Sequence, residues 1–243
     1  MNIDNERNFH EKRYADDQRN TKFLSSAYLV GSIAYEFFFK KLRLISEGCE
    51  VLEYGSGISM YANNIVLSAA NITGIDISAE AVKISNSKMI QYDNCKYLVM
   101  DAMNLDFCDE KFNLVYGCGI IHHLDVDKAF SEIYRVTKHG GKTLFLEPLG
   151  HNPFVNFFRK LSPKLRSKDE HPLTIDDMEV IRKYFKKVNF TYFSLVSIAL
   201  IPVVRVFPLF IFMVRFANFI DKLFFALRFP RRWAWIVIVE CEK

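Results

Sequence analysis

The chain has 243 residues, and its hydrophobic fraction of 50% argues against a disordered protein and allows one large core. Its five cysteines are dispersed, with no Cys-x-x-Cys pair, which predicts reduced thiols in a cytoplasmic setting and neither a disulfide framework nor a metal site. The net charge of +4 conceals an asymmetry: residues 1–150 carry 16 Lys and Arg against 20 Asp and Glu, whereas residues 151–243 carry 16 against 8. The basic part suits anionic lipid headgroups or nucleic acid, or is simply a solvated face.

The chain begins with a polar segment that has no features of a secretory signal peptide, followed by helical spacing over residues 27–44. Apolar strands then alternate with helices. The strands are predicted at 50–54, 72–76, 96–100, 112–117 and 142–147, and the helices at 60–70, 79–90 and 126–137. Near-continuous apolar strands separated by helices indicate a buried, mostly parallel sheet in a doubly wound α/β fold.

The pattern changes after Pro148. Residues 150–172 are polar and proline-punctuated and are predicted to form a loop. Thr174 and Asp177 predict a capping box for a helix over 175–183, and strands are expected at 186–193 and 233–241. Between these two strands lies a hydrophobic insertion, about 195–230, so the whole sheet would have seven strands.

A glycine turn follows the first strand, and an acid ends the second. The run is Glu53-Tyr54-Gly55-Ser56-Gly57, and the second strand ends in Gly74-Ile75-Asp76-Ile77. Glycines let the backbone approach a ligand closely, and an acid at the tip of the next strand can accept hydrogen bonds from both hydroxyls of a ribose. This pattern predicts a nucleoside-binding site.

These motifs resemble those of the class I S-adenosylmethionine-dependent methyltransferases, in the small-molecule branch that includes the ubiquinone-type C-methyltransferases. The resemblance covers residues 48–150, where Arg135-Val136-Thr137-Lys138-His139-Gly140-Gly141 matches a later motif. The chain departs from the family at Ser59, where a third glycine is frequent. A dinucleotide fingerprint would need glycine at position 60, which is Met60 here, and a cofactor without pyrophosphate does not need that close approach. The resemblance implies a Rossmann-like sheet with an antiparallel last strand.

The resemblance also implies which residues hold the cofactor, S-adenosyl-L-methionine. Glu53 would receive the methionine ammonium, unless it only fixes the amides of the turn. Asp101 would contact the adenine amino group, unless it only caps the next turn. The full predicted set is Glu53, Gly55, Ser56, Gly57, Asp76, Ile77, Asp101, Ala102 and Cys118.

Four residues near the carboxyl ends of the fourth and fifth strands are the predicted catalytic set. His122 and His123 follow the fourth strand, at the edge where ligands of open α/β sheets bind, and an imidazole there could act as general base. We favour His122 for that role. Glu147 and His151 would orient the acceptor. The alternatives are that the histidines are structural and that Glu147 and His151 only cap the loop.

The insertion is hydrophobic but is broken by Arg205, Pro202 and Pro208, so we expect no transmembrane helix. Residues 209–228 form a helix in which polar residues make one mostly basic stripe and phenylalanines cover much of the rest. The stripe comprises Arg215, Asn218, Asp221, Lys222 and Arg228. Three roles stay open: a lid over an apolar pocket, a helix in an anionic membrane interface (through 195–232), and a dimer contact.

The sequence therefore predicts methyl transfer to a small, hydrophobic or lipid-linked acceptor by a cytoplasmic enzyme, or one peripheral to the inner face of the membrane. We expect one domain in three parts: an N-terminal helical cap at 1–47, the cofactor-binding core at 48–150, and the substrate loop, last strands and insertion at 151–243. The rival hypotheses are an RNA or protein methyltransferase, a nicotinamide enzyme and a non-catalytic binding module. Nucleic acid is the less favoured partner, because no appended RNA-binding domain is visible.

Overall fold

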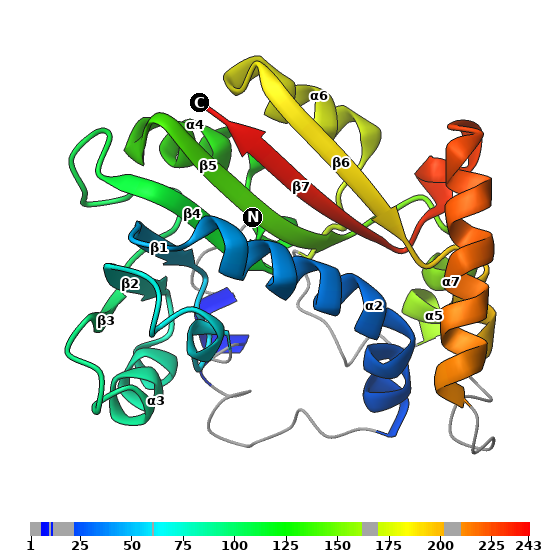
Figure 1. Cartoon of the computed structure of the whole chain (residues 1–243), viewed down its shortest axis with the longest axis horizontal. Helices are drawn as coiled ribbons and strands as arrows, with labels where there is room; N and C mark the ends of the chain where they lie inside the picture. Colours follow the sequence, from blue (N-terminus) through cyan, green and yellow to red (C-terminus); the bar gives the residue numbers. More distant parts are fainter. Residues whose placement is uncertain (1–5, 10, 12–21, 60, 162–169, 202–209) are drawn as a thin grey trace.

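The computed structural model describes residues 6–9, 11, 22–59, 61–161, 170–201 and 210–243. One seven-stranded sheet crosses the molecule in the order β3-β2-β1-β4-β5-β7-β6 (Figure 1). Its strands are β1 (Glu50–Tyr54), β2 (Asn71–Asp76), β3 (Cys95–Val99), β4 (Phe112–Cys118), β5 (Thr137–Pro148), β6 (Lys187–Phe193) and β7 (Ile236–Glu242). The predicted fold class is thus confirmed.

The first five strands run parallel, whereas β7 lies antiparallel to both β5 and β6. β7 is the last strand of the chain, but it lies between β5 and β6 in the sheet. Its predicted antiparallel direction is confirmed. The carboxyl ends of β1, β2 and β4 consequently meet at one edge of the sheet. The glycine turn follows β1 at this edge, and the two histidines follow β4.

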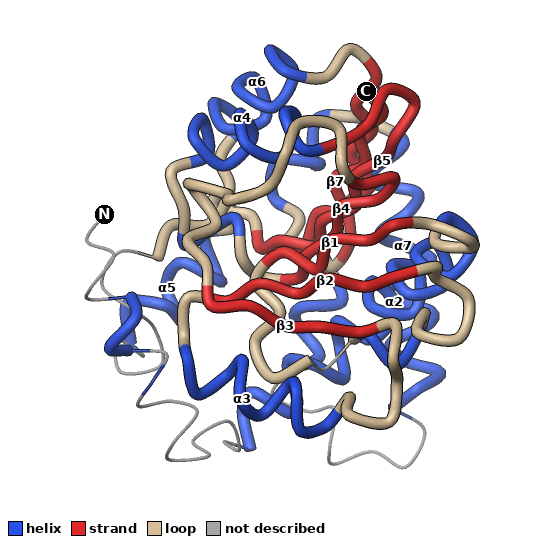
Figure 2. The backbone as a smooth tube through the Cα atoms, turned by 90° about the vertical axis from the view of Figure 1, so that its left-hand side faces the viewer, coloured by secondary structure: helices blue, strands red, loops and turns tan. Residues whose placement is uncertain are grey.

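Helices cover both faces of the sheet (Figure 2). They are α2 (Lys22–Ile45), α3 (Ala79–Lys88), α4 (Val126–Val136), α5 (Pro153–Leu161), α6 (Ile175–Tyr184) and α7 (Phe210–Ala226). One buried cluster joins α4 and α6 to the sheet through Phe130, Ile133 and Ile181. The other joins α2 to the opposite face through Phe38 and Leu42. Each face therefore has its own apolar core, as expected for parallel strands that are buried on both sides.

One predicted helix is wrong. In place of a helix over 60–70, the structure has a short 3-10 helix, η1 (Ala62–Asn64), followed by turns, and Met60 lies outside the described residues. The amide of Asn64 donates to the carbonyl of Tyr61 at 3.0 Å, and the hydroxyl of Ser68 donates to the carbonyl of Ile65 at 3.1 Å. Short polar side chains thus compete for carbonyls that an α-helix would use.

The predicted loop over 150–172 is also wrong in part, because it contains α5. Asn152 accepts hydrogen bonds from the amides of Phe154 at 3.0 Å and Val155 at 3.1 Å, and Pro153 begins the helix. An N-cap asparagine followed by proline is a helix-start signal that the sequence contained.

The insertion forms η4 (Ser197–Leu200), α7 and η5 (Phe229–Trp233). Arg205, Pro202 and Pro208 lie outside the described residues. No helix within the described part of the chain has both the length and the hydropathy needed to cross a bilayer. The three-part domain division was an expectation from the sequence, and it stays a prediction.

Candidate functional site

The glycine turn after β1 has the backbone conformation that its composition predicts. Gly55 and Gly57 have φ of 70° and 54°, in the region that favours glycine. A Cβ on Gly55 would lie 2.4 Å from the side chain of Ile120, so the turn also needs glycine to pass beneath the loop after β4. The amide of Ser56 donates to the carbonyl of Ile75 at 2.8 Å, which joins the turn to β2.

Asp76 lies at the end of β2 and is bonded to the turn. Its Oδ2 accepts from the amide of Gly57 at 2.8 Å, and its Oδ1 accepts from the amide of Ser78 at 2.9 Å. Each carboxylate oxygen can accept more than one hydrogen bond, so both can also receive a ribose hydroxyl. The carboxylate is half-buried, and the structure brings it together with the glycine turn as predicted.

Glu53 is buried at the end of β1. The hydroxyl of Tyr97 lies 3.2 Å from its Oε2 and also 2.7 Å from the hydroxyl of Ser59. Burial raises the pKa of Glu53 to about 8; the hydroxyls of Tyr116 and Tyr97 oppose the rise, and the charge of Asp76 adds to it. The carboxyl group is therefore poised to change its charge near neutral pH.

Two further predicted cofactor residues lie on the loop after β3. Asp101 Oδ1 accepts from the amide of Met103 at 2.8 Å, so Asp101 does cap its own turn. The carbonyl of Ala102 accepts a hydrogen bond from the hydroxyl of Tyr54, which ties this loop to β1. Ile77 and Cys118 are half-buried at the carboxyl ends of β2 and β4. The contacts of Asp101 and Cys118 with the cofactor stay predictions.

The residues present fit S-adenosylmethionine. Among the described residues, Oε1 of Glu53 and the hydroxyl of Ser56 are buried without a hydrogen-bond partner. Buried polar atoms are normally satisfied, and a ligand ammonium would satisfy this carboxylate. Glu53 would thus hold the methionine end and Asp76 the ribose, and the positive-φ glycines would bring main-chain amides close to the ligand.

We expect Glu53→Gln to stabilise the protein at alkaline pH and to weaken cofactor binding. The pKa of Glu53 is about 8 in the folded protein against an ordinary value of 4.5, so the folded state binds the extra proton. The free energy of unfolding is therefore highest below 4.5 and falls as the pH rises to about 8. The neutral amide does not incur this loss, so a gain of up to about 4–5 kcal/mol at pH 8.5 would raise Tm by roughly 9–18 °C.

Thermal unfolding at pH 5 and 8.5 would measure this difference, and Glu47→Gln is the control because Glu47 is exposed. Calorimetry with S-adenosylhomocysteine at pH 7 should show the release of about one proton by the wild type and none by the variant. A Tm difference that is the same at both pH values would contradict the raised pKa of Glu53.

His122 is clamped by Glu147. The fully buried carboxylate accepts from Nδ1 of His122 at 2.7 Å, and its other oxygen accepts from the amides of Ile120 and Ile121, each at 2.9 Å. Because a carboxylate can only accept, Nδ1 carries a proton, and in the neutral imidazole Nε2 is then the acceptor. Glu147 also caps the 3-10 helix η2 (Ile121–His123). The hydrogen bonds of Glu147 position the imidazole of His122. The direct orientation of the acceptor by Glu147 stays a prediction.

His123 packs its ring against His122, with the ring centroids 4.2 Å apart. Its Nδ1 lies 3.3 Å from Oε2 of Glu6, a buried residue of the N-terminal segment. Burial lowers the pKa of His123, and the neighbouring His122 lowers it further, whereas Glu6 and Glu170 oppose the decrease. Burial and His122 thus disfavour the charged form of His123, whose ring packs against that of His122.

Glu170 completes the polar surroundings of the histidines. The amide of His171 donates to the carbonyl of His122 at 2.8 Å, and Arg159 of α5 pairs with Glu170 at 2.6 Å. Within the described residues, one group, His122, His123 and Glu170, has ligand atoms within 4.8 Å of one another. Metal analysis of the purified protein would test the prediction of no metal.

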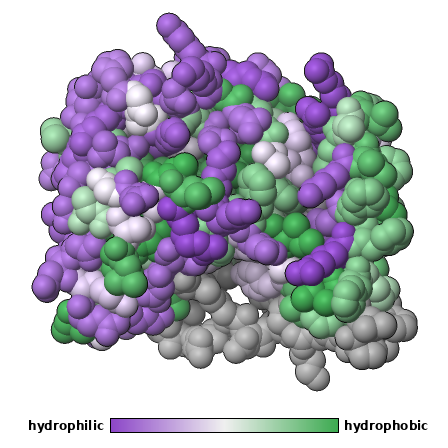
Figure 3. Space-filling view, in the orientation of Figure 1, coloured by the Kyte–Doolittle hydropathy of each residue, from purple (hydrophilic) through white to green (hydrophobic). Residues whose placement is uncertain are grey.

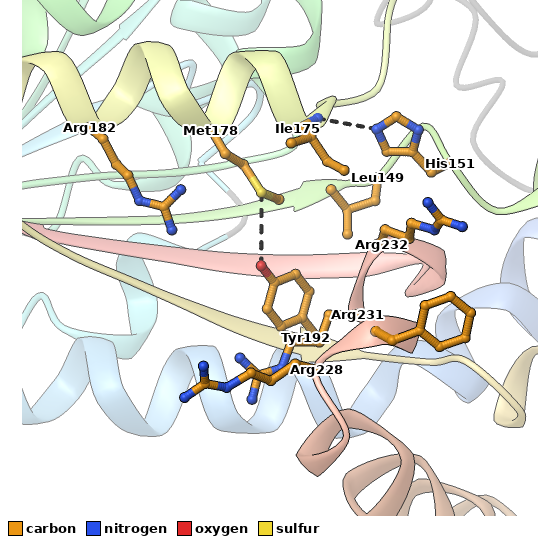
Figure 4. A pocket seen from close by; sticks show the side chains of 10 residues that line it. Leu149, His151, Ile175, Met178, Arg182, Tyr192, Arg228, Arg231 and Arg232 are labelled. Carbon is orange, nitrogen blue, oxygen red and sulfur yellow. Dashed lines mark hydrogen bonds between the residues drawn. The ribbon is translucent and has the colours of Figure 1, made fainter.

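The hydrogen bond that His151 makes does not connect it to His122, His123 or Glu170. Its Nε2 accepts from the amide of Ile175, at the start of α6, at 3.1 Å (Figure 4). It lines a separate pocket together with arginines from α6 and η5. The alternative of loop capping therefore describes its contacts, and its role in orienting the acceptor stays a prediction.

Some residues of the site were missed in the sequence. The N-terminal segment brings Glu6 to His123, and Glu11 accepts from the amide of Ala79 at 2.8 Å, beside Asp76. Tyr97 on β3 holds Glu53, and Gly74 leaves room for its ring: a Cβ there would lie 2.2 Å from it. Glu6 and Glu11 are isolated acids in a polar segment, and no sequence pattern marks them as site residues. Tyr97 could have been found, because it lies opposite Gly74 on the neighbouring strand.

Comparison with known proteins agrees with this geometry. Residues 52–145 match the family described as the methyltransferase domain. The chain is 30% identical over 119 residues to the sterol 4-C-methyltransferase strm-1 of Caenorhabditis elegans, covering 47% of this chain and 35% of the relative. It is 32% identical over 124 residues to a ubiquinone/menaquinone biosynthesis C-methyltransferase of Psychromonas ingrahamii, covering 47% of this chain and 49% of the relative. The chain thus spans a third to a half of these curated relatives.

The fold also matches solved structures. The phosphoethanolamine N-methyltransferase 2 of Haemonchus contortus, in complex with S-adenosylhomocysteine, has a TM-score of 0.61 at 18% identity, covering 94% of this chain and 59% of that one. A methyltransferase of Thermotoga maritima has a TM-score of 0.64 at 16% identity, covering 98% and 99%. The glycine turn with its strand-end acids, the family match and these relatives together identify residues 52–145 as a methyltransferase domain of the S-adenosylmethionine-dependent class.

Proposed function

We propose that the protein transfers a methyl group from S-adenosylmethionine to a small, hydrophobic or lipid-linked acceptor, with His122 as general base. The observation that carries this proposal is the hydrogen bond between Nδ1 of His122 and Glu147 at 2.7 Å, which fixes the imidazole just after β4, at the sheet edge where the glycine turn and Asp76 also lie. The curated relatives are named for sterol and ubiquinone or menaquinone acceptors, and this supports the proposed class.

Bound S-adenosylmethionine supplies the methyl group, as its carbon–sulfur bond breaks and the electron pair stays on the sulfur. His122 accepts at Nε2 the proton that the acceptor loses as its oxygen, nitrogen or carbon bonds to the methyl carbon. Glu147 then stabilises the resulting imidazolium, because its buried carboxylate faces Nδ1. Alignment of acceptor and cofactor supplies much of the acceleration, since the sulfonium is already an activated group.

We further propose that the enzyme acts in the cytoplasm, at the inner face of a membrane. All five cysteines are unpaired, in keeping with a reducing compartment. A membrane surface would supply the lipid-linked acceptor at high local concentration.

Incubation with methyl-labelled S-adenosylmethionine and a cell extract would test the function. We expect the label to appear in the fraction that organic solvent extracts, and to be absent from that fraction with the Asp76→Asn variant. Label in tRNA or protein would favour the rival methyltransferases. A protein that binds S-adenosylhomocysteine but labels nothing would support the non-catalytic binding module instead.

A further inference from the structure

Helix α7 is oriented with polar residues inward and apolar residues outward. Asn218 and Asp221 are buried at 4% and 1% exposure, whereas Phe212 and Phe216 are 64% and 65% exposed. This overturns the single basic stripe expected from the sequence, because two of its members face the protein. We call the outward set the apolar stripe: Phe212, Phe216, Phe219, Leu223 and Leu227.

The orientation of α7 is firmly set by Asp221. Its carboxylate accepts from the amides of Leu195 at 3.1 Å and Val196 at 2.6 Å, and from the hydroxyl of Ser197 at 2.8 Å, at the start of η4. Rotating the helix to bury the phenylalanines would break these bonds and leave a buried acid unsatisfied. The outward apolar stripe is therefore built into the fold, and such exposed patches mark interaction surfaces.

The stripe follows one line along the helix, with members spaced three or four residues apart. Arg215 and Lys222 are exposed, and this spacing puts both on one flank of the stripe. Figure 3 shows the apolar residues gathered along the side of the molecule where α7 lies in Figure 1. Apolar residues flanked by cations are typical of a helix that lies in the interface of a membrane.

A cationic pocket continues from the end of the stripe. Leu227 is followed by Arg228, which lines a pocket of about 370 Å³ together with Arg182, Arg231 and Arg232 (Figure 4). Among the described residues no acid lines this pocket, and Arg228, Arg231 and Arg232 form no ion pair. Arg228 has a φ of 61°, a strained conformation for a residue other than glycine.

Aromatic rings hold the arginines in place around the pocket. The guanidinium of Arg231 lies 5.9 Å from the ring centroid of Tyr192, and its Nε donates to the carbonyl of Phe225 at 2.8 Å. Arg232 stacks on Trp233 at 4.8 Å. Guanidinium groups fixed in this way bind phosphate oxygens through paired hydrogen bonds.

We propose that the apolar stripe and the arginine pocket together dock the protein on a membrane that contains anionic phospholipid. The stripe enters the acyl boundary, and the pocket binds the phosphate of one lipid headgroup. Charge complementarity and the continuity from Leu227 to Arg228 favour this occupant over a second copy of the chain or an RNA. The inference deepens the proposed function and rests on it for the lipid character of the acceptor.

Vesicle flotation tests the docking with wild type, Phe216→Glu/Leu223→Glu and Arg228→Gln/Arg232→Gln. The vesicles are phosphatidylcholine alone, or phosphatidylcholine of which about a third is replaced by phosphatidylglycerol. We expect the wild type to bind the anionic vesicles, the stripe variant to lose this binding, and the arginine variant to bind them about tenfold more weakly. The controls are Leu67→Glu/Ile90→Glu and Lys83→Gln/Lys128→Gln, which introduce the same change in charge at exposed apolar and cationic residues elsewhere.

The proposal would be overturned if the wild type bound neutral and anionic vesicles equally well, or if the variants bound anionic vesicles as well as the wild type does. It would also be overturned by a dimer that only the stripe variant dissociates, tRNA binding without vesicle binding, or displacement from vesicles by millimolar inorganic phosphate alone, which would assign the pocket to a free anion. Each variant is also titrated with S-adenosylhomocysteine. Vesicle binding without cofactor binding would refute the proposed function and leave the docking intact, and the reverse result would refute only the docking.

Discussion

Asp76→Asn is expected to weaken the binding of S-adenosylhomocysteine about 100-fold, because hydrogen bonds to an ionised group contribute about 1.5–3 kcal/mol each. Both carboxylate oxygens already accept main-chain amides, from Gly57 at 2.8 Å and Ser78 at 2.9 Å. An asparagine must therefore turn its own NH2 group toward one of these donors, whichever way it is flipped. The substitution thus disturbs the glycine turn as well as removing the charge that faces the ribose.

Calorimetric titration with S-adenosylhomocysteine measures this loss, and Asp93→Asn is the matched control because Asp93 is exposed. Thermal unfolding should show a cost of about 1–3 kcal/mol for the unsatisfied donor. Unchanged affinity in a folded Asp76→Asn variant would remove Asp76 from the cofactor site. The identity of the ligand would then have to be sought elsewhere on the sheet edge.

His122→Gln is expected to lower kcat by about 10²- to 10⁴-fold with little change in KM for the cofactor. The glutamine side chain offers no base, whereas Glu53 and Asp76 lie on β1 and β2 and stay in place. Steady-state assay of methyl transfer to the extracted acceptor measures both constants. His139→Gln is the control, because His139 is exposed and pairs only with Glu110 among the described residues. A variant with unchanged kcat would show that alignment alone accounts for the catalysis.

Glu147→Gln separates positioning from structure at the same site. Both oxygens of Glu147 accept hydrogen bonds. The side chain of a glutamine must therefore turn its NH2 group toward either the main-chain amides of η2 or the imidazole. The second arrangement forces Nδ1 of His122 to accept and moves the proton to Nε2, where it blocks the base. Nitrogen NMR of the imidazole would detect the changed tautomer, and kcat should fall with it. A purely structural Glu147 would lower stability and leave the tautomer unchanged.

The elements of the fold that the sequence predicted are those with local signals. All seven strands and the helices near 27–44, 79–90, 126–137, 175–183 and 209–228 are confirmed, because apolar periodicity and caps such as Thr174 act over a few residues. The exceptions were local as well. Short polar side chains broke the expected helix at 60–70, and Asn152 with Pro153 started a helix inside the expected loop.

The glycine turn and the strand-end acids could be located from the sequence, since their signals depend on neighbours in the chain, and their contacts with the cofactor stay predictions. The partners of the histidines and the orientation of α7 depend on the tertiary fold. Glu147 reaches His122 across 25 residues and Asp221 reaches Val196 across 25, and no periodicity encodes such pairings. The physical reason is that the hydrogen-bond partners of a buried carboxylate are the donors that the fold brings close to it. For α7, satisfying Asp221 decided that the phenylalanines face outward.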